Sequence, residues 1–79
     1  MKINRFNLEF TKHARKRLRE RNITEHQVMY SLRDRIRNIR LYRNSKKELA
    51  YKSGGVSIIF VVYHFTIKVI TVIDKDAEV

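Results

Sequence analysis

Residues 10–23 constrain the fold most, because they predict one short amphipathic helix. The apolar residues of this stretch recur every four positions and form a narrow stripe that can lie against a sheet. They are Phe10, Ala14 and Leu18. The expected ends of the helix are a hydroxyl N-cap at Thr11 and a left-handed stop at Asn22.

Beside this stripe, His13, Arg17 and Arg21 follow the same four-residue step. A titratable imidazole and two fixed cations are therefore expected along one edge of the buried contact. That arrangement suits phosphate chemistry. It is equally typical of a solvated, positively charged rim, and the spacing alone leaves both interpretations open.

Charge narrows the choice of partner. The chain has 79 residues, with 18 Lys and Arg against 8 Asp and Glu, so its net charge is +10. A domain this basic predicts a polyanionic partner: nucleic acid first, an acidic protein second and an anionic membrane surface third. A solvated face that only maintains solubility is the alternative. Apart from Arg17 and Arg21, the cations expected to contact nucleic acid are Arg15, Lys16, Arg33, Arg35, Arg37, Arg40 and Arg43.

The remaining chain predicts a second helix and a sheet. Thr24 and Gln27 form a capping box that begins a helix ending near residues 32–35. Residues 2–9 alternate weakly and suit a short strand or an extended lead-in. Alternating or β-branched runs then predict strands at 39–42, 49–52, 56–63 and 67–73, with turns at 53–55 and 64–66.

The predicted fold class is α+β: two N-terminal helices packed on a four-stranded antiparallel β-meander. One domain spans residues 1–79, with an acidic tail from about 74 to 79. A domain of this size buries limited surface, and forming a homodimer would add to its stability.

The sequence lacks the residues that several classes of function require. The chain has no Cys, its three His share no metal-ligand spacing, and its acids are scattered, so no metal and no cofactor is expected. The absence of Cys and of an apolar leader suits a cytoplasmic protein. Residues 56–73 are apolar but interrupted by polar side chains, so they suit strands and not a membrane span.

Metal-free RNA cleavage fits this inventory. The RNA 2′-hydroxyl attacks the adjacent phosphorus, a base takes its proton, cations stabilise the phosphorane, and an acid protonates the departing 5′-oxygen. Strand tyrosines that can stack on unpaired bases, or simply pack in the sheet, are Tyr42, Tyr51 and Tyr63.

One sequence pattern is similar to that of a known family. The pattern is Phe-Thr-x-His-Ala-x-x-Arg-x-x-x-Arg-x-Ile. It falls here on Phe10, Thr11, His13, Ala14, Arg17, Arg21 and Ile23. This pattern resembles a family of small domains of unknown function, similar to RelE and BrnT toxins of the barnase–EndoU–colicin–RelE ribonuclease superfamily. Residues 69–73 are similar to that family's closing strand, and the resemblance covers roughly residues 8–73.

The resemblance implies two N-terminal helices on a curved antiparallel sheet. It implies His13 as the acid/base residue, Arg17 and Arg21 as phosphate-contacting cations, and Thr71 as a polar group on the last strand. Strand placement adds Tyr51 and Lys52 to these candidate catalytic residues. Two departures stand out: residues 35–36 replace the glycine expected after the second helix, and the acidic tail is extra.

The expected function is a metal-independent endoribonuclease, the toxin of a toxin–antitoxin pair, with RNA as substrate and an acidic antitoxin as partner. One alternative is a non-catalytic DNA- or RNA-binding protein of the same fold. A protein-interaction module with a basic face is another. Members of one fold often differ in activity, so the fold by itself does not choose among them.

Overall fold

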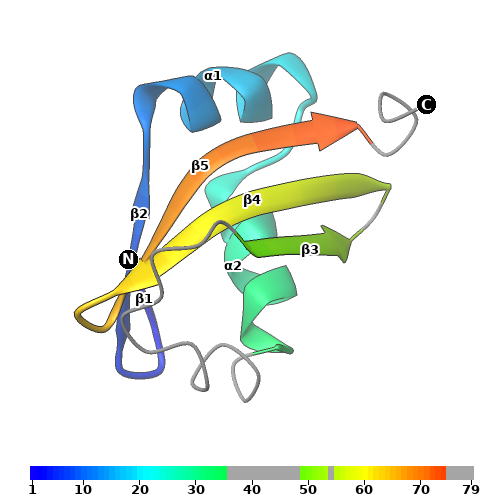
Figure 1. The fold of residues 1–79 in the computed structure, drawn as a ribbon. Helices are drawn as coiled ribbons and strands as arrows, with labels where there is room; N and C mark the ends of the chain where they lie inside the picture. Colours follow the sequence, from blue (N-terminus) through cyan, green and yellow to red (C-terminus); the bar gives the residue numbers. More distant parts are fainter. Residues whose placement is uncertain (36–48, 54, 75–79) are drawn as a thin grey trace.

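The computed structural model describes residues 1–35, 49–53 and 55–74. In these ranges, two short helices follow two N-terminal strands, and three further strands come after them (Figure 1). The elements are β1 (Lys2–Ile3), β2 (Phe6–Phe10), α1 (Lys12–Glu20), α2 (Glu25–Arg33), β3 (Leu49–Ser53), β4 (Val56–Tyr63) and β5 (Thr66–Asp74). Neither helix of the described chain is long and apolar enough to cross a membrane.

The strands form one five-stranded sheet in the order β1-β2-β5-β4-β3. β3, β4 and β5 form an antiparallel meander, as predicted. The prediction of a purely antiparallel four-stranded sheet is wrong, because β2 pairs with β5 in parallel and β1 pairs with β2. The weakly alternating N-terminal residues thus build two strands and make the sheet mixed. The strand expected at 39–42 and the tail at 75–79 lie outside the described residues.

The predicted caps are confirmed, but the first helix is shorter than expected, because α1 spans only Lys12–Glu20 and Phe10 belongs to β2 instead of the helix stripe. The Thr11 hydroxyl accepts a hydrogen bond of 3.0 Å from the Ala14 N–H at the start of α1. At α2, the Thr24 hydroxyl accepts from the Gln27 N–H at 3.1 Å, and the Gln27 side chain accepts from the Thr24 N–H at 2.8 Å. Asn22 has a φ of 55°, the left-handed conformation that turns the chain between the two helices.

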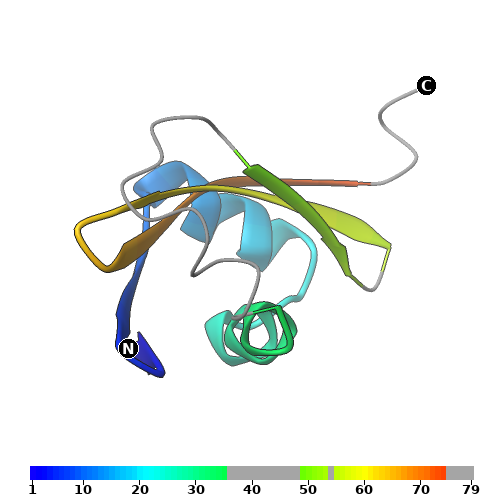
Figure 2. The ribbon, with the colours of Figure 1, turned by 60° about the horizontal axis from the view of Figure 1, so that its bottom comes forward.

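Both helices cover the same face of the sheet, as Figure 2 shows with the strands nearly edge-on. Ala14 and Leu18 of α1 and Val28 and Leu32 of α2 are buried in one core, as their spacing predicted. Ile23 packs against that core from the corner between the helices. The strands contribute Ile3, Phe6, Leu8, Ile58, Phe60, Val62, Ile67, Val69 and Val72.

The turn between β4 and β5 is tighter than expected. The prediction placed it at residues 64–66, but Thr66 already belongs to β5. His64 and Phe65 alone form the connection, with φ values of 44° and 54°. Positive φ at both residues of a two-residue loop matches the twist of a β-hairpin.

Thr11 joins α1 to β5 as well as capping the helix. Its hydroxyl donates to the Ile70 carbonyl at 2.8 Å, and its N–H donates to the Val69 carbonyl at 3.1 Å. The side chain is therefore both a cap and a tether between a helix and a strand.

Replacing Thr11 by alanine is expected to lower the free energy of unfolding by about 1–2 kcal/mol, because both hydrogen bonds of the hydroxyl are lost while the backbone bond to Val69 is kept. Urea unfolding followed by circular dichroism measures the change. Thr11→Ser is the matched control, since it keeps the hydroxyl and should lose much less. Equal losses in the two variants would show that the hydroxyl is not the stabilising group.

Candidate nucleic-acid interface

The first helix presents cations over its whole solvent-facing surface. Ala14 and Leu18 are buried against the sheet, and Glu20 is the single acid of the helix. The cations on or next to α1 are Lys12, Arg15, Lys16 and Arg19, which are exposed, and Arg17 and Arg21, which are half-buried. Such a helix has the charge needed to bind a chain of phosphates.

His13, Arg17 and Arg21 lie along one flank of α1, here called the His13 flank. Arg17 contacts Glu20 at 3.5 Å between Nη1 and Oε1. Arg21 donates from Nη1 to the Arg17 carbonyl at 3.4 Å. The His13 imidazole is exposed, and no hydrogen bond or ion pair joins it to another residue of the described chain. It is therefore accessible to a ligand from solvent.

The closing strand reaches the start of this helix. Thr71 follows Ile70, whose carbonyl holds the Thr11 side chain. Thr71 is half-buried and pairs in register with Ile59, while its neighbour Val72 is in the core. Because successive strand residues alternate between faces, Thr71 belongs to the face of the sheet away from the helices. The helix motif and the closing strand therefore lie side by side in the fold, but Thr71 is on the face of the sheet that α1 does not cover.

Positions 51 and 52 do not join the other candidates in one cluster. Tyr51 pairs in register with Ile58 and Lys52 with Ser57, so the two positions belong to opposite faces of β3. Position 52 shares a face with Thr71, two strands away, at a distance of about 10 Å between strand axes. The six predicted catalytic residues are thus divided among the His13 flank and the two faces of the sheet.

The second group of predicted cations is described only in part. Arg15 and Lys16 are on α1, and Arg33 and Arg35 are exposed at and just beyond the end of α2. The positions that lie outside the described residues are Arg37, Arg40 and Arg43, together with Tyr42.

A polar contact that the sequence did not predict lies on the face of the sheet away from the helices. Tyr63 is half-buried, and its hydroxyl donates to Glu9 Oε1 at 3.4 Å. Glu9 pairs in register with Lys68 across the parallel β2–β5 contact. The hydrogen bond between Tyr63 and Glu9 joins residues 54 positions apart, so no local pattern could have predicted it. The Tyr63 side chain therefore has a contact within the sheet besides any role in stacking.

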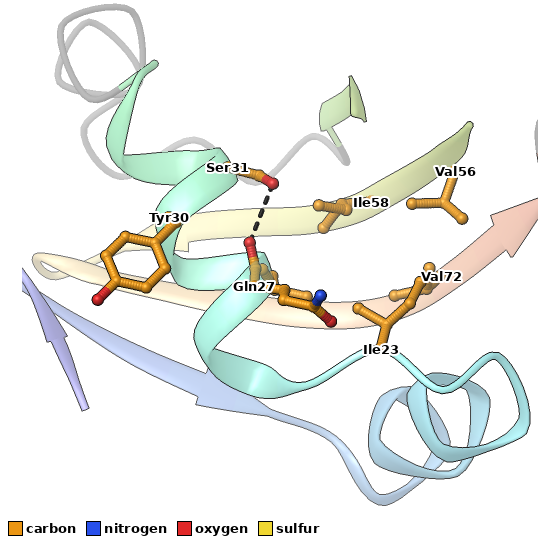
Figure 3. Close-up of a pocket in the computed structure, with 8 residues that line it drawn as sticks. Ile23, Gln27, Tyr30, Ser31, Val56, Ile58 and Val72 are labelled. Atoms are coloured by element: carbon orange, nitrogen blue, oxygen red, sulfur yellow. Dashed lines mark hydrogen bonds between the residues drawn. The ribbon is translucent and has the colours of Figure 1, made fainter. Parts of the chain in front are cut away.

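The hollow between α2 and the ends of β4 and β5 is mainly apolar, with a volume of about 360 Å³ (Figure 3). Its polar wall includes Ser31, whose hydroxyl donates to the Gln27 carbonyl at 3.0 Å. None of the described residues that line it is a cation or a histidine. This hollow therefore gives no support to phosphate chemistry. Its lining residues are Ile23, Gln27, Val28, Tyr30, Ser31, Val56, Ile58 and Val72.

Fold and surface together define a small α+β protein with a mixed sheet and a strongly basic first helix. Within the described ranges, no three His, Cys, Asp or Glu side chains are grouped to hold a metal ion. No family model, no curated protein and no solved structure matches the chain.

Proposed function

We propose that this protein is a RelE-like, metal-independent endoribonuclease and the toxin of a toxin–antitoxin pair. The observation that supports it best is the His13 flank, which aligns an accessible imidazole with two guanidiniums along a helix fixed to β5. An imidazole can transfer protons near neutral pH, and guanidinium groups match phosphate oxygens.

In the proposed reaction the RNA 2′-oxygen forms a bond to the neighbouring phosphorus while the bond from phosphorus to the 5′-oxygen breaks. His13 exchanges a proton with the reacting oxygens, and Arg17 and Arg21 stabilise the charge of the phosphorane. The products are a 2′,3′-cyclic phosphate and a free 5′-hydroxyl. DNA lacks the attacking group and would be bound without being cut.

The proposed protein partner is an acidic antitoxin. A net charge of +10 favours association with an acidic surface, and a partner lying on α1 would also prevent RNA from reaching it. Homodimer formation remains a prediction.

The second candidate is a nucleic-acid-binding protein without catalysis. The exposure of His13, with no partner for its imidazole among the described residues, favours this candidate. Catalytic bases are usually oriented by a neighbouring group. In this case the cations of α1 would bind phosphates and His13 would have no chemical role.

Cleavage and binding measured together test both candidates. A labelled single-stranded RNA and the DNA of the same sequence are incubated with the protein in EDTA, and fluorescence anisotropy gives affinity over a series of salt concentrations. We expect cyclic-phosphate products from RNA, intact DNA, and affinities that fall as salt rises. Binding of both without cleavage would contradict the ribonuclease proposal and support the second candidate. If neither nucleic acid binds at physiological salt, both candidates fail.

A further inference from the structure

A second hollow lies where α1 meets the start of α2, and it is here called the corner hollow. Its volume is about 620 Å³, within the range of small-molecule sites. Both helices contribute to its walls. The lining residues are Lys12, Arg15, Leu18, Arg19, Ile23, Thr24 and Glu25.

The cations of this hollow share one flank of α1. Lys12, Arg15 and Arg19 are separated by three and four residues, so they are neighbours on the helix surface. With Ala14 and Leu18 against the sheet, this flank is opposite to the His13 flank. The corner hollow is therefore a separate feature from the candidate catalytic residues.

The apolar wall of the hollow comes from the corner between the helices. The Ile23 N–H donates to the Leu18 carbonyl at 2.9 Å, after Asn22 has turned the chain with positive φ. Ile23 is half-buried, and it places an apolar side chain beside the cations. Cations next to an apolar wall suit a ligand that has both a phosphate and a flat ring.

One carboxylate opposes these cations. Glu25 Oε1 lies 3.3 Å from Arg15 Nε, and the two side chains are 39% and 61% exposed. An ion pair that exposed contributes little, so a phosphate can replace the carboxylate at Arg15. No described residue forms a hydrogen bond or an ion pair with the side chain of Lys12 or Arg19. Both are accessible to an anion.

We infer that the corner hollow is a nucleotide subsite for single-stranded RNA. The phosphate lies between Lys12, Arg15 and Arg19, and the base lies against Ile23 and the edge of Leu18. The identity of the ligand rests on the proposed function, because RNA is taken from it. The subsite holds a nucleotide outside the one that is cleaved, on the opposite flank of α1.

The test compares two double variants that remove the same charge. Lys12→Gln with Arg19→Gln removes two cations of the hollow, and Lys2→Gln with Arg5→Gln removes two exposed cations near β1. Affinity for a labelled single-stranded RNA is measured by anisotropy over a salt series. We expect the first variant to lower the salt slope by about 2 and the second to leave it nearly unchanged. Equal changes in the two variants would overturn the subsite.

Two further measurements locate the ligand. Uridine 5′-monophosphate should shift the backbone amide resonances of Ile23 and Thr24 in the wild type, while inorganic phosphate alone should shift them less, because it lacks the ring. Glu25→Gln should raise RNA affinity by about threefold, since it removes a competitor for Arg15. An unchanged or lower affinity, or amide shifts elsewhere only, would contradict the proposal. Nucleotide binding here by a protein that cleaves no RNA would leave the subsite standing and the ribonuclease proposal overturned.

Discussion

Replacing His13 by alanine is expected to lower the rate of RNA cleavage by roughly 10²–10⁴-fold, the usual contribution of a positioned acid or base. RNA affinity should change little, because the cations of α1 remain. Single-turnover cleavage of a labelled RNA in EDTA, with protein in excess, measures the chemical step separately from binding. The affinity comes from anisotropy on the same RNA under the same conditions.

His26→Ala is the matched control for this prediction. His26 is also exposed, but it lies in the first turn of α2 and outside the candidate site. It should leave the cleavage rate within about twofold, since no part of the proposed chemistry uses it. Wild-type cleavage by His13→Ala would remove His13 from the mechanism. Equal losses in both variants would point to a general effect on the fold.

Replacing Leu32 by alanine is expected to cost about 2–5 kcal/mol of unfolding free energy. Leu32 is fully buried, at 0% exposure, in the core that joins α2 to the sheet. Domains of this kind have only about 5–15 kcal/mol of stability, so the variant should be partly unfolded at moderate temperature. Urea unfolding followed by far-ultraviolet circular dichroism measures the loss.

The control for this variant is the next residue. Arg33 is exposed at the end of the same helix, and Arg33→Ala should cost no more than about 0.5 kcal/mol. If Leu32→Ala lost no more unfolding free energy than Arg33→Ala, the assignment of Leu32 to the core would be contradicted.

The local features of the fold could be predicted because the sequence contains their causes within a few residues. The Thr11 cap, the Thr24–Gln27 capping box and the left-handed Asn22 each depend on side chains close in the chain. The hairpin of β3 and β4 likewise follows from two strands joined by glycines.

The parallel pairing of β2 with β5 could not be predicted in this way. Alternation in a strand indicates which residues share a face, but it does not indicate which distant strand will be the neighbour. The tether from Thr11 to Ile70 has the same origin, since it joins residues 59 positions apart. An interpretation based on consecutive hairpins therefore missed the N-terminal side of the sheet.

The candidate site, like the fold, was predictable only where the residues involved are close in the sequence. Helical spacing placed His13, Arg17 and Arg21 on one flank of α1 from the sequence alone. The period of a strand also implies that adjacent residues such as Tyr51 and Lys52 belong to opposite faces, so their joint assignment to one site was weaker. The corner hollow depends on how two helices meet, and no periodicity describes that.

The position of β5 has a consequence for how the protein is made on the ribosome. β5 is the last described strand to be synthesised, yet it lies between β2 and β4 and holds the cap of α1. Until β5 has emerged, β2 has only β1 beside it and α1 lacks the strand that holds its cap, and closing such a distant contact slows folding. A nascent chain that stops before residue 66 therefore contains the residues of α1 but lacks β5, the strand that supports this helix. Any activity that depends on the placement of α1 begins only when translation has passed β5.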